Sequence, residues 1–288
     1  MDKIHPAVCF GFFLAAIIMS AAISHPAYLG ASFIGALLLN LSLTGGKVWK
    51  KLALFLPLSL LIAAVNPLFN SLGETVLFTC WGKPYTLEAL LYGIVLGGML
   101  LSMLLWFSAY NTVMTGDKFS FLFGTLSPSL SLLLVTVFRM IPNLSGKLRQ
   151  ILAVRKCIGM GAGENASGKE KLVGGVTALS ALTSWAFEGG VVTADAMNSR
   201  GYGTGRRSCF HTYHFTAGDV LISVTLTGTL VCALVFLFAG GAATEFTPVF
   251  RPGPVHPVGL AAYLAFLLTP TILNWNEDIK WYVFRSKI

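Results

Sequence analysis

With 288 residues, 55% of them hydrophobic and only 11% charged, the chain has a mean hydropathy of +0.73. A soluble domain carries about 25% charged residues, so this composition excludes an ordinary water-soluble protein and indicates that the bilayer is the main solvent. The net charge of +8, from 20 Lys and Arg against 12 Asp and Glu, is typical of membrane-protein loops that face anionic lipid or a partner. The basic residues flank the apolar runs without the signature of a nucleic-acid-binding fold, so nucleic acid is not an expected partner.

Six apolar runs predict membrane-spanning helices, because a helix needs about 20 apolar residues to cross the hydrocarbon core. In chain order they are 8–23, 28–43, 52–65, 87–113, 220–239 and 259–273. Two weaker runs, 130–141 and 172–192, are interrupted by a charged residue or by glycines, and we expect them to lie partly in or against the membrane. Segment 75–86 is predicted to be a loop. The sequence therefore predicts an all-α integral membrane protein with about six transmembrane helices, within a range of four to eight.

The chain divides into three regions. Residues 1–116 hold the N-terminal membrane helices, 117–207 form a basic middle region, and 208–288 hold the C-terminal membrane helices and a basic tail. The middle region is predicted to contain two long helices, 128–158 and 169–199, each followed by a glycine that stops it.

Lysine and arginine predict the orientation of the chain. With both termini inside, the external segments contain only Lys83 and Arg251, which leaves 18 of the 20 basic residues on the cytoplasmic side or in segments attached to it. The positive-inside rule counts short loops best, and the turn at 47–51 and the tail at 280–287 both agree with it. We therefore expect both termini and the region 117–207 to be cytoplasmic.

The end of the second middle helix is the strongest candidate for binding. Ala196 and Arg200 are four residues apart on one helical face, and Gly201 follows in the position where helices stop. A slim helix end with one guanidinium fork can enter a groove and pair with a carboxylate. The plainer interpretation is an ordinary helix C-terminus, in which the Arg complements the dipole and the Gly caps it, and the residues alone leave both interpretations open.

Other patterns indicate packing rather than chemistry. Gly93 and Gly97 form a GxxxG in the fourth span and are expected to pack helices, and Asp219 is expected to be the N-cap of a span. His211 and His214 are three residues apart, but no acidic or thiol residues at metal spacing support them, so no metal site is expected. The cysteines show no paired spacing and are expected to be free thiols. They are Cys9, Cys80, Cys157, Cys209 and Cys232.

The region from Arg139 to Gly203 resembles the transmembrane T component of energy-coupling factor (ECF) transporters, the EcfT/CbiQ/BioN family. Four further stretches agree with it and extend the resemblance over nearly the whole chain. They are His5-Pro6, His25-Pro-Ala-Tyr-Leu29, Asn66-Pro-Leu-Phe69 and Trp281-Tyr-Val-Phe-Arg-Ser-Lys287. The order of these pieces, together with the two helix ends, is more specific than any one of them.

The resemblance implies a scaffold in a prokaryotic cell membrane, not an enzyme. In that family two cytoplasmic coupling helices each end in a short Ala-Arg-Gly motif, which docks in a groove of one ABC ATPase subunit. The membrane part grips a separate substrate-binding S component. The two partner ATPases bind ATP and Mg, and this chain is implied to need no cofactor of its own. Hydrolysis topples the S component and releases a vitamin or transition-metal ion inside.

The resemblance assigns docking roles to residues at both helix ends. They are Ala196, Arg200 and Gly201 in the second motif, and Ala153, Arg155, Lys156 and Gly159 in the first. The first motif departs from the family pattern, because Ile158 stands where the Arg before the Gly is expected. Arg155 and Lys156 lie on the same helix close to Ala153 and are the candidates to take over that contact.

A self-sufficient channel or secondary transporter is the main alternative. Such a protein would want charged residues at a site inside the membrane, and the predicted spans contain almost none apart from border groups such as Glu88 and Asp219. A membrane-embedded enzyme would need clustered His, Asp and Glu, whereas the five histidines are spread over distant borders. The sequence contains no Walker motif, so it predicts no ATPase site in this chain.

Overall fold

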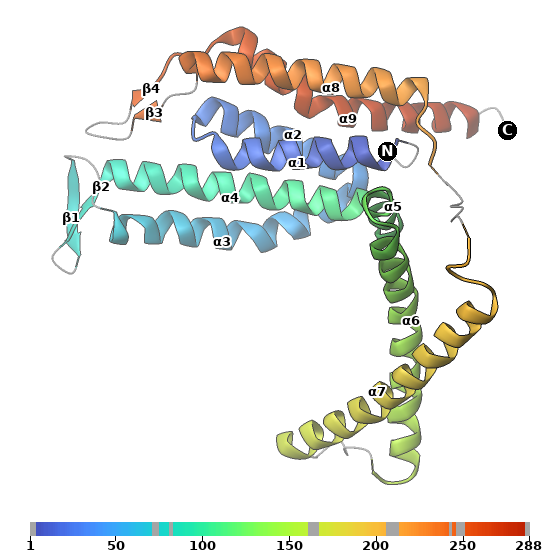
Figure 1. Ribbon diagram of the computed structural model, residues 1–288. Coiled ribbons are helices and arrows are strands. Elements are labelled where there is room, and N and C mark those ends of the chain that lie inside the picture. Colours follow the sequence, from blue (N-terminus) through green and yellow to red (C-terminus); the bar gives the residue numbers. More distant parts are fainter. Residues whose placement is uncertain are drawn as a thin grey trace. The chain divides into compact units, whose positions relative to one another are not determined.

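The structure is a computed structural model of the chain. It describes residues 4–70, 75–80, 83–160, 167–205, 213–241, 244–245 and 251–285. The chain forms two compact units (Figure 1), each described here by itself. Unit 1 comprises Met1–Thr115 and Tyr213–Ile288, and unit 2 comprises Gly116–Thr212. The middle region delimited by sequence, 117–207, lies within unit 2.

Unit 1 consists of helices joined by short turns and two small hairpins. Its helical elements are α1 (Pro6–Ala22), α2 (Pro26–Thr44), the 3-10 turn η1 (Gly45–Lys47), α3 (Val48–Phe69), α4 (Leu87–Val113), α8 (Ala217–Phe236), the π-helical turn η2 (Leu237–Gly241) and α9 (Pro257–Arg285). Its strands are β1 (Val76–Cys80), β2 (Lys83–Thr86), β3 (Thr244–Glu245) and β4 (Arg251–Pro252). Helix α4 packs against α3 on one side and α1 and α2 on the other, while α9 packs against α2 and α8 (Figure 1).

The segment between α3 and α4 is a hairpin, so the prediction of a loop over 75–86 is wrong. Strands β1 and β2 pair antiparallel, with Phe78 opposite Tyr85 and Thr79 opposite Pro84. Val, Phe, Thr and Tyr favour a pleated backbone, and they outweigh the turn residues that suggested a loop. The sequence contains Trp81-Gly82 at the centre of this hairpin, outside the described residues.

The described residues of unit 2 form three helices in succession. They are α5 (Gly116–Leu126), α6 (Pro128–Cys157) and α7 (Gly168–Ser199). Pro128 occupies the first turn of α6. Its lack of an N–H costs no helical hydrogen bond there, because N–H groups in the first turn have no acceptor within the helix. Ser167 caps α7 in a reciprocal capping box with Glu170, which satisfies two of the helix's first N–H groups. The two long helices predicted over 128–158 and 169–199 are therefore confirmed.

The protein is an all-α integral membrane protein. Among the described residues, five stretches are long and apolar enough to cross a bilayer: Pro26–Phe69, Leu87–Val113, Ser129–Cys157, Ala217–Ala239 and Pro257–Trp281. The first has 44 residues, about twice the length of one crossing, and η1 divides it into α2 and α3. Each of the six predicted spans falls on a helix of unit 1, although α1, with 17 residues, is shorter than a typical crossing.

Helix α6 qualifies as a candidate span only through its first half. Its longest apolar run, 130–138, precedes Pro142, and Lys147, Arg149, Arg155 and Lys156 lie in the second half. Four charges within the ten residues 147–156 are costly in hydrocarbon, so the second half requires water, lipid headgroups or protein around it. The expectation that 130–141 lies partly in or against the membrane stays a prediction.

Helices α1 and α2 begin with the same N-terminal capping arrangement. His5 and His25 are their N-caps, and Pro6 and Pro26 follow at the first helical position. Each imidazole Nδ1 accepts the backbone N–H two residues on, at 3.3 Å for Ala7 and 3.2 Å for Ala27. The repeated His-Pro-Ala sequence therefore fixes where both helices start.

Aromatic residues and a few satisfied polar side chains form the core of unit 1. Phe12 packs against Phe13, Trp106 and Phe266, with ring centroids 5.1–5.7 Å apart. The indole Nε1 of Trp106 donates to Ser32 Oγ at 3.0 Å, and the hydroxyls of Ser32 and Ser20 are 2.6 Å apart. These bonds link α1, α2 and α4. A buried indole N–H needs an acceptor, and here the acceptor is a serine hydroxyl of a neighbouring helix.

The GxxxG of α4 packs helices, as the sequence predicts. A Cβ added to Gly93 would lie 2.5 Å from the carbonyl oxygen of Ala63, and one added to Gly97 would lie 2.6 Å from that of Ser59. Both carbonyls belong to α3, so the two backbones approach closely along this seam. In lipid such packing replaces the hydrophobic effect as the force that joins helices.

Substituting Ala for Gly97 should therefore separate α3 from α4. Overpacking of this kind typically costs about 1–3 kcal/mol, which should appear as a lower melting temperature of the detergent-solubilised protein. Gly228→Ala on α8 is the matched control, because an added Cβ there meets nothing within 4 Å. Equal melting temperatures for the two variants would show that the α3–α4 seam tolerates side chains.

Helix α8 begins with a capping box that also reaches α1. Thr216 is the N-cap and its hydroxyl accepts the N–H of Asp219 at 3.4 Å, while the Asp219 carboxylate accepts the Thr216 N–H at 3.0 Å. The other carboxylate oxygen accepts the backbone N–H of His5 at 3.1 Å. The expectation that Asp219 is the N-cap is therefore wrong, because Thr216 takes that position and Asp219 completes the box three residues later.

Candidate functional site

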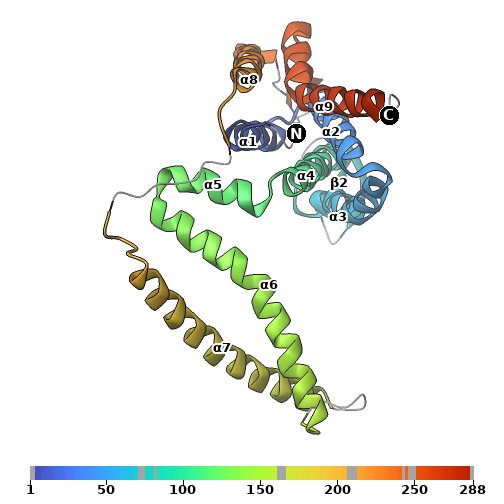
Figure 2. The ribbon, with the colours of Figure 1, turned by 90° about the vertical axis from the view of Figure 1, so that its right-hand side faces the viewer.

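Helices α6 and α7 of unit 2 pack against each other, and all the docking residues implied by the sequence lie in these helices or within two residues of their C-terminal ends. In α7 the less exposed residues recur at helical spacing: Gly174, Ala178, Leu182, Trp185 and Gly189. In α6 they are Met140, Leu144, Leu148, Ile151 and Arg155. One stripe of each helix is thus shielded, and in Figure 2 the end of α6 lies beside the start of α7 while the helices diverge farther on.

One directed contact joins the two long helices midway. The ammonium group of Lys147 on α6 lies over the ring of Trp185 on α7, 5.3 Å from its centroid. A cation–π contact at a partly exposed site contributes about 0.5–1 kcal/mol. It fixes the rotation of α6 about its own axis relative to α7, which the small residues Gly174 and Ala178 would not do alone.

Helix α7 ends in a complete Schellman motif. Gly201 has a φ of +76°, its N–H donates to Asn198 O at 2.9 Å, and the N–H of Tyr202 donates to Met197 O at 3.0 Å. Arg200 is the last residue before the reversal, and its backbone N–H donates to Ala196 O at 3.2 Å. Its side chain is exposed, and among the described residues its guanidinium has no partner.

Helix α6 ends in the same backbone motif. Gly159 has a φ of +75°, its N–H donates to Lys156 O at 3.2 Å, and the N–H of Met160 donates to Arg155 O at 2.9 Å. The Arg155 side chain is occupied at its own helix end, because its guanidinium donates to the Met160 carbonyl at 3.3 Å. Lys156 is exposed.

The two glycines set the register between the helix ends. Counting back from Gly159 and Gly201, Ile158 takes the position of Arg200 and Val154 takes that of Ala196. Ala153 then falls one residue too early. The sequence comparison alone paired Ala153 with Ala196, and a count from the helix-stopping glycine would have shown the shift.

The site residues form two separate groups and do not converge. The end of α6 lies beside the start of α7, where Leu152, Arg155, Lys156, Met160, Lys171, Gly174 and Gly175 line a hollow of about 270 Å³. Helix α7 then runs for 32 residues, about 48 Å at 1.5 Å per residue. Arg200 and Ile158 therefore lie roughly a helix length apart, too far to serve one small-molecule site and suited to two contacts with a large partner.

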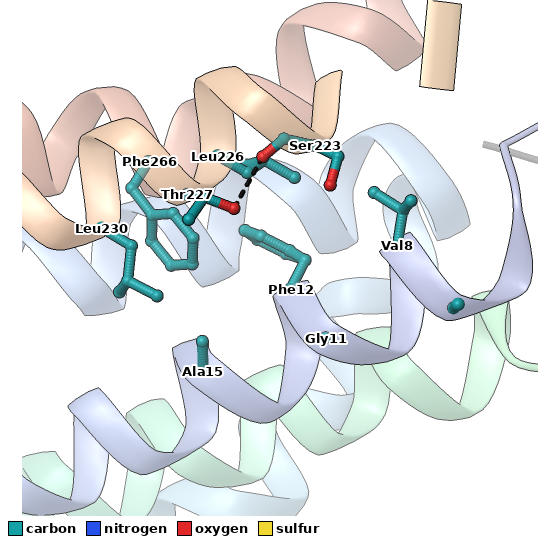
Figure 3. A pocket seen from close by; sticks show the side chains of 10 residues that line it. Val8, Gly11, Phe12, Ala15, Ser223, Leu226, Thr227, Leu230 and Phe266 are labelled. Carbon is teal, nitrogen blue, oxygen red and sulfur yellow. Dashed lines mark hydrogen bonds between the residues drawn. The ribbon is translucent and has the colours of Figure 1, made fainter. Parts of the chain in front are cut away.

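A second hollow lies inside unit 1, between α1 and α8 (Figure 3). It has a volume of about 210 Å³ and an apolar lining, with Val8, Gly11 and Phe12 on one side and Leu226 and Leu230 on the other. The hydroxyl of Thr227 is satisfied within its own helix by Ser223 O at 2.8 Å. The hollow thus offers hydrocarbon contacts and no convergent polar groups, unlike a solute-binding site.

Metal-binding residues do not gather in the described part of the chain. No group of three or more His, Cys, Asp and Glu side chains lies together there. His211 lies outside the described residues, and so do Arg206 and Arg207. Of the cysteines that the structure describes, Cys157 and Cys232 are free thiols, and Cys157 at the end of α6 is exposed.

No family model matches the chain, and no curated protein matches it either.

We expect Gly201 to be needed for the reversal at the end of α7 because glycine adopts a positive φ without strain. Ala at position 201 would have to adopt a positive φ, which costs about 1–2 kcal/mol, so Gly201→Ala should make the Tyr202 amide exchange about tenfold faster. Gly205→Ala is the control, because Gly205 has no positive φ and an added Cβ meets nothing within 4 Å. Unchanged exchange in Gly201→Ala would mean that the motif is not maintained in solution.

Proposed function

We propose that this chain is the energy-coupling scaffold of an importer of the ECF type. Its membrane helices would hold a substrate-binding S component, and α6 and α7 would transmit the work of two partner ABC ATPases that bind ATP and Mg. The cargo would be a vitamin or a transition-metal ion. The observation that carries the proposal is the pair of long helices in unit 2, each closed by the same glycine reversal. The two ends lie about 48 Å apart, as estimated from the 32 residues of α7.

The chemistry of the α7 end supports docking. Arg200 stands at the extreme end of a helix, next to small neighbours, with its side chain exposed. A guanidinium fork in this position can bind a carboxylate at two points, and truncating one member of such a buried pair typically costs about 2–5 kcal/mol. Rigid helices are suited to convert movement at such a contact into movement elsewhere in the protein.

The exposed apolar surface of unit 2 also supports a partner. Leu172, Val176, Phe187 and Val191 of α7 are each more than half exposed, and Ala178 is the fully buried residue of this helix. Large apolar patches on a surface mark contacts with protein or membrane. A self-sufficient channel has less support, because Glu88 and Asp219 lie in the first turns of α4 and α8 and not in mid-span.

Orientation in the cell can be tested with a native residue. Cys157 is exposed at the end of α6, and we propose that this end is cytoplasmic together with both termini. In a variant with Cys9, Cys80, Cys209 and Cys232 replaced by Ser, a membrane-impermeant maleimide should label Cys157 in inverted vesicles but not in intact cells. Strong labelling in intact cells would reverse the orientation. A variant with Cys80 as the only cysteine is the control and should label from outside.

Arg200→Glu should abolish uptake and release the ATPases while the protein stays in the membrane, since the reversed charge would meet the carboxylate that Arg200 binds. Arg200→Ala should be severe as well. Arg155→Ala and Lys156→Ala should each be mild, because Arg155 already donates to Met160 O and a Lys offers a less directed contact. The measurements are substrate uptake and the ATPase retained on purification.

Arg149→Ala is the matched control, because it also removes an exposed guanidinium, but one that lies within α6 and away from either helix end. Normal uptake by Arg200→Glu would end the docking role of α7. A loss in Arg155→Ala as large as that in Arg200→Ala would show that α6 docks through Arg155.

A further inference from the structure

The hollow between α1 and α8 is a trough with a wall of small residues and an aromatic floor (Figure 3). Its α1 wall includes Ala7, Gly11 and Ala15, which are four residues apart and therefore lie on one helical face. Ala7 and Gly11 are exposed, whereas Phe12 and Phe266 behind them are buried. A Cβ added to Gly11 would meet no described atom within 4 Å, so protein leaves this part of the trough unfilled.

The polarity of the lining changes along the trough. The hydroxyl-bearing residues Ser223 and Thr227 come first on the α8 wall, and Leu230 follows at its far end. The Thr227 hydroxyl is already bonded to Ser223 O, so this side chain offers its methyl group to a ligand. The trough is therefore most polar near the helix starts and purely apolar at its deeper end.

The depth of the trough selects the chemistry of its occupant. Ser223 and Leu230 lie 6 and 13 residues beyond Ala217, the first residue of the α8 span, which places them about 9 and 20 Å along the helix. The hydrocarbon core of a bilayer is about 30 Å thick, so the trough runs from one leaflet toward the midplane. Lipid acyl chains are the molecules that surround a protein at this depth, and a dissolved solute is not present there.

The size of the trough suits a single hydrocarbon chain. Its volume is about 210 Å³, and an apolar cavity of about 150 Å³ already takes up benzene. A partner helix is about 10–12 Å wide, so it would lie across α1 and α8 and send only side chains into the trough. An unbranched chain, by contrast, can lie along the floor and contact both walls.

We infer that this trough binds one acyl chain of a phospholipid from the leaflet in which α1 and α8 begin. The two helices are bonded to each other at their starts, where the His5 N–H donates to the Asp219 carboxylate at 3.1 Å. Farther along, the acyl chain replaces the missing side chains between them and restores the dispersion contacts that an empty space forfeits. This lipid site is independent of the proposed importer function.

The test uses the full chain reconstituted with a phosphatidylcholine that carries a diazirine midway along one acyl chain. The protein is returned to mild detergent and washed, and native mass spectrometry then counts the lipid that remains. Wild type should retain about one phospholipid per chain, and illumination should crosslink it to peptides of α1 and α8. Gly11→Leu fills the trough with a side chain and should lower retention at least about tenfold.

The opposite wall supplies a second variant and the same helix supplies the control. Thr227→Leu also adds carbon to the trough and should lower retention in the same direction. Gly228→Leu adds the same side chain as Gly11→Leu, but at a residue of α8 outside the lining where a Cβ meets nothing within 4 Å, and should retain the lipid. Gly11→Leu should melt at least as high as delipidated wild type, because its leucine occupies the site.

Equal retention by Gly11→Leu and wild type would overturn the inference, and so would crosslinks confined to helices other than α1 and α8. A wild-type protein that keeps no lipid, or keeps only detergent or free fatty acid, would overturn it as well. Since none of these measurements involves an ATPase or transport, each outcome leaves the proposed function to its own tests.

Discussion

Backbone polar groups in the spans of unit 1 must find their partners inside the protein, because the bilayer core supplies no water to bind them. This constraint explains why the span-forming segments are helices. Several buried polar side chains are paired as well, whereas Ser102 Oγ and Thr271 Oγ1 have no hydrogen-bond partner among the described residues. Asn40 donates to the carbonyls of Ala36 and Leu105 at 2.9 and 2.8 Å, and Trp106 donates to Ser32. The bonds from Asn40 to Leu105 and from Trp106 to Ser32 join α2 to α4, so groups that lipid cannot satisfy also help to decide that these helices are neighbours.

Close approach is the other requirement of the membrane unit. Gly93 and Gly97 let α4 meet the carbonyls of α3, and Gly259 at the start of α9 leaves room for Phe236 of α8, whose Cβ would lie 2.7 Å from an added methyl group. Without a hydrophobic force between helices in lipid, stability comes from such contact area. The apolar hollow between α1 and α8 marks a place where this close packing is relaxed.

Unit 2 is held together differently. Its long helices expose most of their apolar residues and share one shielded stripe, reinforced by Lys147 over Trp185. A pair of helices with so little buried surface is stable only where lipid or protein covers the rest. The same exposure leaves the two helix ends accessible, and their glycine reversals present Ile158 and Arg200 on equivalent backbones.

The sequence by itself determined the membrane class, the six helices of unit 1 and the two long helices of unit 2, because length, apolar composition and the Pro and Gly signals act locally along the chain. It also singled out Gly93, Gly97 and the end at Arg200. Tertiary structure alone decided that Asp219 binds His5, that 75–80 pairs with 83–86, and that Lys147 meets Trp185. It also decided that the guanidinium of Arg155 donates to the Met160 carbonyl at its own helix end. Each of these depends on distances between groups far apart in the chain or on a single backbone reversal, and a one-dimensional pattern does not contain such information.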